Sequence, residues 1–74
     1  MLELQLRGDY IELDKLLKAT GLADSGGQAR ALITAGEVKV DGQVELRKTA
    51  KIRAGQRVEL GTASVQVRAA PGAA

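Results

Sequence analysis

The stretch SGGQARALITAGEVKVDG, from Ser25 to Gly42, constrains the fold of this chain most strongly, because a helix start, a helix stop, a strand and a tight turn follow one another in it. The Ser25 hydroxyl can accept backbone amide hydrogens of a first helical turn, and Gln28 completes a capping box. Gly36 stands where a C′ glycine ends many helices. The pattern therefore predicts a short helix between Ser25 and Gly36.

This predicted helix is amphipathic. At about 100° per residue, its apolar residues share one face, and a glycine, a basic residue and a polar residue share the other. The two sets are Ala29, Leu32 and Ile33 against Gly27, Arg30 and Thr34. Arg30 is therefore expected in solvent, one turn along from the glycines.

Gly26 and Gly27 are unusual in a first helical turn, because a glycine inside a helix costs roughly 1 kcal/mol relative to alanine. In a functional interpretation, the missing side chains let a phosphate approach the amides at the helix N-terminus, where the macrodipole favours an anion. In a structural interpretation, the helix starts later and these are loop glycines, or a neighbouring element packs closely there. The local sequence leaves both interpretations open.

A β-hairpin is predicted around Asp41-Gly42, a dipeptide typical of tight turns. Apolar residues alternate with polar ones on both sides of it: Val38 and Val40 before the turn, Val44 and Leu46 after it. A two-residue loop would place Val40 opposite Gln43 and conflict with this alternation. We therefore expect one more loop residue or a bulge, which brings Val40 near Val44. Val38 then lies near Leu46.

The N-terminal part of the chain predicts a strand followed by a first helix. Residues 2–7 alternate between leucine and polar residues, as in a strand with one apolar face. Asp9 and Glu12 have the spacing of a capping pair for a helix that ends at Gly21. Its apolar stripe is Leu13, Leu16 and Leu17, and Lys15 and Lys18 lie opposite, on a face expected to contact solvent rather than a partner.

The C-terminal part predicts a second hairpin. Gly61-Thr62 forms a two-residue turn that places Leu60 beside Ala63, and the last strand extends to Val67. Residues 69–74, AAPGAA, have too little to bury, so we expect one domain over residues 1–68 and a disordered tail over 69–74. The fold class is α+β: a helix-turn-helix-like pair packed on a small, mainly antiparallel sheet of four to five short strands.

Composition argues against catalysis. A chain of 74 residues has too small a core for a deep catalytic cleft, and it contains neither Cys nor His, the commonest thiolate and imidazole ligands and the commonest general base. We expect no enzyme activity, no metal, no cofactor and no small-molecule substrate. No apolar run approaches the ~20 residues of a membrane span, and the N-terminus lacks a signal-peptide pattern, so we expect a soluble cytoplasmic protein without membrane contact.

Positive charge is concentrated in residues 47–53, RKTAKIR, although 11 Lys and Arg against 9 Asp and Glu leave a net charge of only +2. The four cations of this segment are Arg47, Lys48, Lys51 and Arg53, and Ile52 is its expected core anchor. Such a run is often a solvated loop. Beside Arg30 and Lys39, however, it would form a phosphate-binding rim.

Tyr10 is the only aromatic residue. Single-strand binders of the RRM and OB types stack bases on several aromatic side chains. The sequence lacks such a platform, so an RNA partner is expected to be recognised through the shape of its backbone.

The motifs, taken in order, resemble a known family. LDKLL is followed by SGGQAR, by LITAGEVKVDG, by the basic segment and by a glycine turn before VEL. This order resembles the RNA-binding domain named after small-subunit ribosomal protein S-four. The SGG, VKVDG and E-x-R-K segments are similar to its stand-alone bacterial members, the YbcJ-like family. The resemblance covers residues 10–60.

The resemblance implies an alpha-L motif, in which RNA lies on the surface formed by the second helix and the loop after the hairpin. It implies an RNA anchor without chemistry of its own. We therefore expect a monomeric, non-catalytic module that binds structured RNA, with ribosomal RNA or ribosomal particles as the partner. Carried onto this chain, the contacts come from the backbone of Ser25, Gly26 and Gly27 and from the side chains of Arg30, Lys39, Arg47, Lys48 and Lys51. Glu12 and Gly26 stand where many members have Arg, which implies weaker binding or a different docking pose.

A second interpretation is a protein-interaction adaptor, in which Gly26-Gly27 packs closely against a partner subunit and the charges serve solubility. A DNA-reading helix-turn-helix is disfavoured, because the second helix offers few side chains able to bond base edges. The salt dependence of binding distinguishes the RNA-binding module from the adaptor. Phosphate binding weakens as salt rises, whereas apolar burial is not screened.

Overall fold

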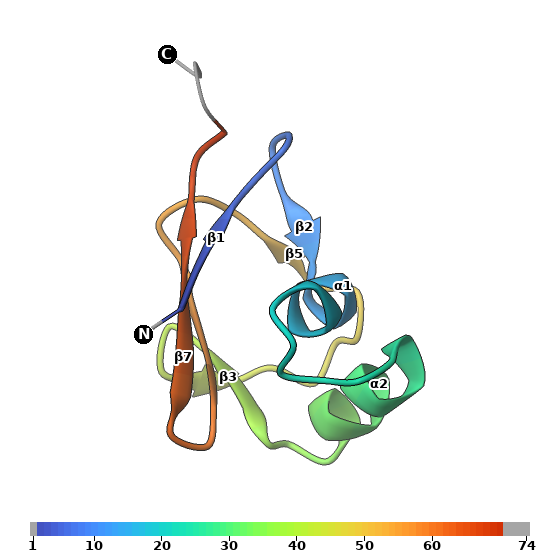
Figure 1. Cartoon of the computed structure of the whole chain (residues 1–74). Helices are drawn as coiled ribbons and strands as arrows, with labels where there is room; N and C mark the ends of the chain where they lie inside the picture. The colour runs from blue at the N-terminus through green and yellow to red at the C-terminus, as the bar shows by residue number, and fades with distance from the viewer. Residues whose placement is uncertain (1, 71–74) are drawn as a thin grey trace.

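The computed structural model describes residues 2–70 and contains two helices, a five-stranded sheet and a two-stranded ribbon (Figure 1). The helices are α1 (Leu13–Ala19) and α2 (Gly26–Thr34), and the strands are β1 (Leu2–Gln5), β2 (Ile11–Glu12), β3 (Val38–Val40), β4 (Gln43–Val44), β5 (Lys51–Ile52), β6 (Arg57–Leu60) and β7 (Ala63–Arg68). The sheet order is β1-β7-β6-β3-β4, and β2 pairs with β5. β1 pairs with β7 in parallel, and the other described pairings are antiparallel, so the predicted α+β fold is confirmed.

The core lies between the helix pair and one face of the sheet. Its largest fully buried side chains are Leu13, Leu16, Leu17, Ile33, Val38, Ile52, Val58, Val65 and Val67. Because side chains alternate along a strand, the other face of the sheet carries polar residues. On that face Lys39 of β3 is directly opposite Glu59 of β6. The sheet therefore separates Lys39 from the side on which the helices pack.

α2 begins where the sequence predicted. Ser25 is the N-cap, and its Oγ accepts a hydrogen bond from the Gln28 amide at 3.1 Å. The Gln28 side chain accepts from the Asp24 amide rather than the Ser25 amide, so the capping box is displaced by one residue. Gly36, with φ +79°, ends the helix as expected. Gly26 and Gly27 are the first residues of α2, and the interpretation in which the helix starts after them is wrong.

α1 begins differently from the prediction. The expected capping pair of Asp9 and Glu12 is wrong, because Glu12 is the N-cap and its side chain makes no capping bond. Glu12 instead belongs to β2, where it pairs with Lys51. A strand of two residues shows no periodicity, so the pattern of residues 9–12 gave no sign of this pairing.

The first amides of α1 are bonded by the chain after the hairpin. The Leu13 amide donates to the Ala50 carbonyl at 2.9 Å, and the Asp14 amide donates to the Lys48 carbonyl at 3.0 Å. Helix N-termini require such acceptors, because their first amides have no partner within the helix. The basic segment is thus attached to the start of α1 through its backbone.

The β3–β4 hairpin closes with a two-residue loop, so the expected extra loop residue or bulge is wrong. Val40 pairs with Gln43 and not with Val44. Asp41 and Gly42 both have positive φ, +52° and +85°, which is the geometry that a type I′ turn demands. The geometry of the turn outweighs the apolar alternation beside it.

Val44 and Leu46 consequently do not enter the core. Val44 pairs with Lys39, and the Glu45 amide donates to the Val38 carbonyl, so Val38 lies opposite Glu45 and the expected pairing with Leu46 is shifted by one residue. The Val44 and Leu46 side chains remain 51% and 59% exposed, and a Cβ on Gly36 would lie within 4 Å of both.

The second hairpin confirms the prediction, because Leu60 pairs with Ala63 and Val58 with Val65 across Gly61-Thr62. β1 ends at Gln5, two residues earlier than predicted. Residues 69 and 70 belong to no helix or strand, and the rest of the predicted tail lies outside the described residues.

The Asp41 side chain fastens the first hairpin to β6. Its carboxylate accepts from the Arg57 amide at 2.9 Å and from the Gln56 side chain at 3.3 Å. We expect Asp41→Ala to lower the free energy of unfolding by about 1–3 kcal/mol, because it removes these bonds and places alanine at positive φ. Asp41→Asn, which tolerates this backbone and keeps an acceptor, should lose less than half as much. Urea denaturation measures both, and an unchanged Asp41→Ala stability would contradict the assignment.

Candidate nucleic-acid interface

Three segments that are distant in sequence meet at Asp14: the start of α1, the start of α2 and the loop of residues 47–50. Asp14 is only 8% exposed, and its amide is bonded to the Lys48 carbonyl. Its Oδ2 lies 3.5 Å from Nη1 of Arg30. Asp14 is therefore the common neighbour of the Arg30 guanidinium and of the Lys48 backbone.

The two glycines of α2 have different surroundings. A Cβ on Gly26 would lie 3.3 Å from Nη1 of Arg30, so the missing side chain provides space for the guanidinium. A Cβ on Gly27 would meet only the Ser25 Oγ, at 3.9 Å. Gly26 is thus covered by Arg30, and Gly27 leaves the N-terminus of α2 open to solvent.

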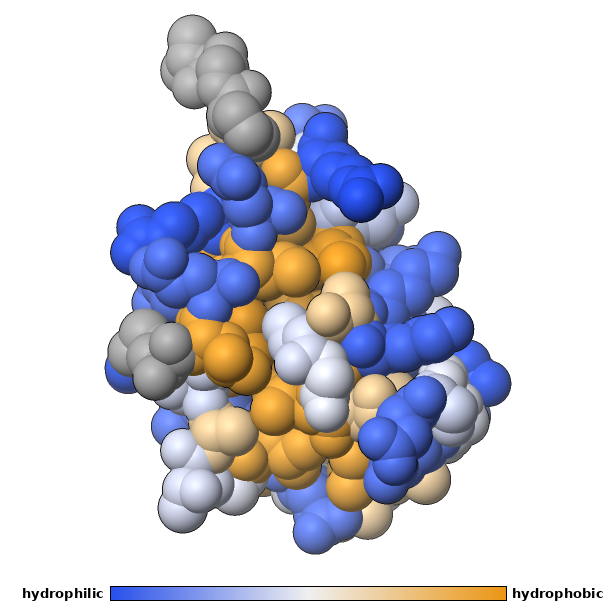
Figure 2. Space-filling model, in the orientation of Figure 1, coloured by the Kyte–Doolittle hydropathy of each residue, from blue (hydrophilic) through white to orange (hydrophobic). Residues whose placement is uncertain are grey.

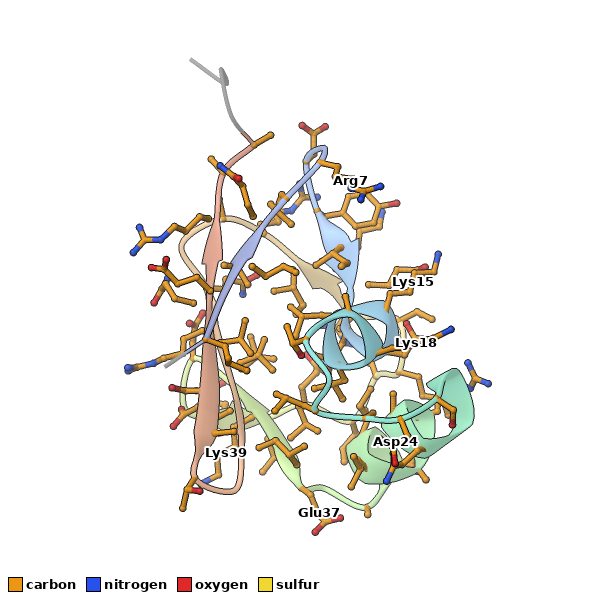
Figure 3. All side chains as sticks on the ribbon, viewed as in Figure 1. Arg7, Lys15, Lys18, Asp24, Glu37 and Lys39 are labelled. Atoms are coloured by element: carbon orange, nitrogen blue, oxygen red, sulfur yellow. The ribbon has the colours of Figure 1, made fainter. Side chains whose placement is uncertain are left out.

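An open depression with a volume of about 210 Å³ lies beside Arg30. It is lined by Asp14, Lys15, Lys18, Gly26 and Arg30. Figure 3 shows Lys15 and Lys18 projecting from the same side of α1. Their exposure was predicted, but their place beside Arg30 was not. The signal available in the sequence was their i,i+3 spacing in a helix that a short connection joins to α2.

Arg47 is held by an acid of its own segment. Its Nε and Nη2 donate to the two carboxylate oxygens of Glu45, each at 3.1 Å. The side-chain hydrogen bond from Arg47 lowers the pKa of Glu45, and the same bond raises the pKa of Arg47. Glu45 is therefore ionised at neutral pH and partly neutralises the positive charge of Arg47.

The remaining predicted cations lie on different sides of the molecule. Lys48 is exposed in the loop attached to Asp14, and Lys51 lies on β5, with its Nζ 5.0 Å from the centroid of the Tyr10 ring. Lys39 shares a shallow hollow with Glu37 and Glu59. Figure 3 shows Lys39 and Glu37 at the end of the molecule away from Lys15. The structure therefore brings the Arg30 guanidinium and the Lys48 backbone to Asp14, with Gly26 beside Arg30, but it does not bring Lys39 to them.

No group of three or more His, Cys, Asp or Glu within residues 2–70 is arranged to hold a metal ion. In the same part of the chain, neither helix is long and apolar enough to cross a bilayer.

Residues 4–68 match the family model of the S4 domain. The chain therefore belongs to the S4 domain family, as the order of its motifs predicted. It is 53% identical over 58 residues to the "Putative RNA-binding protein YbcJ" of Escherichia coli (strain K12), a match that covers 78% of this chain and 83% of YbcJ.

Two further comparisons extend this result. The solution structure of YbcJ from E. coli, described as revealing an "ALFAL motif involved in RNA-binding", is similar to this structure with a TM-score of 0.72 and 48% identity, and the match covers 92% of this chain and 87% of YbcJ. The tyrosine–tRNA ligase of Moorella thermoacetica (strain ATCC 39073 / JCM 9320) is 38% identical over an aligned length of 65, a match that covers 77% of this chain and 16% of the ligase. The predicted YbcJ-like fold is thereby confirmed.

The different surroundings of the two glycines predict different responses to alanine. Gly27→Ala should raise the free energy of unfolding by up to about 1 kcal/mol, because the new methyl group meets open space in a helical position. Gly26→Ala should gain less or lose stability, since its methyl group displaces the Arg30 guanidinium. Urea denaturation of the two variants measures the difference, and equal gains would show that Arg30 does not occupy this space in solution.

Proposed function

We propose that the chain is a non-catalytic cytoplasmic module that binds structured RNA, with ribosomal RNA or ribosomal particles as its partner. Membership of the S4 domain family and the likeness to YbcJ support RNA as the ligand. The observation that carries the proposed contact surface is the meeting of Arg30, the glycine start of α2 and the Lys48 loop around Asp14. We name this set of groups the Asp14 surface.

The N-terminus of α2 provides amide donors for a phosphate. The first amides of a helix have no acceptor within it. In α2 the Ser25 Oγ accepts a hydrogen bond from the Gln28 amide only. The amides of Gly26 and Gly27 lie at the same end, and Gly27 has no side chain to keep a phosphate away. The partial positive charge of the helix N-terminus favours an anion at this position.

Side-chain cations then surround that position. The ion pair of Arg30 with Asp14 is long, at 3.5 Å, and the Arg30 side chain is 50% exposed, so a phosphate can compete for the guanidinium. Lys15 and Lys18 from α1 line the same depression, and the Lys48 backbone adjoins Asp14 at its edge. Because these groups are fixed on three elements, they favour an RNA whose fold holds its phosphates at matching positions.

Two residues of the predicted contact set lie outside the Asp14 surface. Arg47 adjoins Lys48 but is bonded to Glu45, and we propose that it contributes at reduced strength. Lys39 lies across the sheet beside Glu59, and we leave it out of the proposed surface. The adaptor interpretation receives less support, because a partner packed closely against Gly26 would have to displace the Arg30 guanidinium.

The double variant Arg30→Ala/Lys48→Ala tests this surface. It should weaken binding to folded ribosomal RNA fragments and flatten the salt dependence of binding, because each phosphate contact contributes about −0.7 to −0.9 to the slope of log K against log salt. Two lost contacts reduce that slope by about 1.4–1.8. Filter binding or fluorescence anisotropy over a range of salt concentrations measures both quantities.

The matched control is Arg57→Ala/Arg68→Ala, which removes the same charge from exposed positions on the strands β6 and β7. We expect the control to retain most of the affinity and the slope. Circular dichroism checks that both double variants are folded. RNA binding that is equal in the folded double variant and in the parent would refute the placement of the surface.

The bond between Glu45 and Arg47 predicts a gain in affinity. Glu45→Gln should strengthen RNA binding and steepen the salt slope, because it releases Arg47 from a carboxylate that is ionised at neutral pH. Glu3→Gln is the matched control, since it removes an equal charge from an exposed pair with Arg68 on β1 and β7. Equal affinities for these two variants would mean that Arg47 does not contact RNA.

A further inference from the structure

The one aromatic ring of the chain lies on the outer face of the β2–β5 ribbon. Ile11 pairs with Ile52, which is 1% exposed, so alternation turns Tyr10 to the opposite, solvent side together with Lys51 and Arg53. Tyr10 is 43% exposed. The Lys51 Nζ and the Arg53 Cζ lie 5.0 and 5.7 Å from its ring centroid, within the range of cation–π contacts.

Tyr10 also forms one wall of a cleft with a volume of about 450 Å³, within the range of roughly 300–1,000 Å³ that holds small organic ligands. The cleft is also lined by the apolar side chains of Leu4, Leu6, Ile11 and Ala19 and by the basic side chains of Arg7 and Lys15. Figure 2 shows a continuous apolar band on this side of the molecule, bordered by hydrophilic residues. Figure 3 shows Arg7 and Lys15 on the same border. The cleft thus combines an apolar floor, one aromatic wall and a basic rim.

The Tyr10 ring takes part both in this cleft and in contacts with two cations. Tyr10 lines the cleft, whereas Lys51 and Arg53 contact the ring without lining the cleft. Contacts with two cations restrict the ring, which lowers the entropy that it would lose on stacking against a ligand. Lys15 lines both this cleft and the depression beside Arg30, so the two hollows adjoin at Lys15.

We propose that this cleft accepts one unpaired base of the bound RNA, stacked on Tyr10, while the neighbouring phosphates are neutralised by the surrounding cations. The proposal rests on the proposed function and adds a base contact to its phosphate contacts. An RNA nucleotide fits the charges: the basic groups are Arg7, Lys15, Lys51 and Arg53, against the acids Asp9 and Glu12, and Glu12 is bonded to Lys15 at 2.8 Å. A nucleotide supplies both the flat aromatic surface and the anion that this combination recognises.

The test uses the full chain and two RNA hairpins of the same sequence, one with a single bulged nucleotide and one fully paired. Tyr10→Leu should weaken binding to the bulged hairpin by about five- to 150-fold, the range expected for loss of one stacked base, and should leave binding to the paired hairpin unchanged. Tyr10→Phe keeps the ring and should stay within about twofold of the parent. Ala19→Gln, which narrows the cleft without altering the ring, should act like Tyr10→Leu.

A direct readout comes from the ring itself. With ¹³C-labelled tyrosine, Tyr10 gives the only labelled ring signals of the chain, and stacking of a base should shift its ring protons upfield with the bulged hairpin but not with the paired one. Urea denaturation shows that each variant is folded.

The two proposals fail in different ways. Suppose that the parent binds both hairpins and that this binding depends on Arg30 and Lys48. If Tyr10→Leu then shows no selective loss of affinity for the bulged hairpin and the Tyr10 ring protons do not shift, the base contact alone is overturned. Absence of parent binding to either hairpin and to ribosomal RNA fragments at low salt would overturn the proposed function and the base contact together.

Discussion

The two hydrogen bonds from the start of α1 to the loop after the first hairpin are the constraint on which the candidate surface depends. α1 has only seven residues and lacks a side-chain cap, so its first amides rely on the carbonyls of Ala50 and Lys48. These bonds fix the start of the helix, and with it Asp14. Asp14 in turn holds the Arg30 guanidinium over the start of α2. Loop, first helix and second helix are therefore positioned by a single local network.

Ion pairs also bear on how a chain with a net charge of only +2 would present the proposed basic surface. Three of its acids each hold a cation in place while they partly neutralise it: Asp14 pairs with Arg30, Glu45 with Arg47 and Glu12 with Lys15. Each of these pairs involves a cation whose side chain is at least half exposed, so the pairs contribute little stability and can be exchanged for a phosphate. Under the proposed function, RNA affinity would depend on the arrangement of these charges as well as on their sum.

Local patterns in the sequence predicted those parts of the fold that local interactions decide. The Ser25 cap, the glycine stop at Gly36 and the register across Gly61-Thr62 each depend on a few neighbouring residues. The start of α1 could not be predicted in this way, because β2 and β5 are far apart in sequence and only two residues long. The register of the first hairpin was predicted wrongly for another reason. Two local preferences disagreed, and the turn geometry prevailed over the alternation that would have buried Val44.

The candidate site shows the same division. The sequence predicted Arg30 and Lys48 as RNA contacts, but it could not show that both contact Asp14 or that Lys39 lies across the sheet. The role of Gly26 could be assigned only from the structure. A side chain there would come within 3.3 Å of the present Arg30 guanidinium, so the two groups compete for one volume. Glycine at this position lacks the positive charge of the arginine that many S4 domains have there. It also allows the guanidinium of Arg30 to lie over the start of α2.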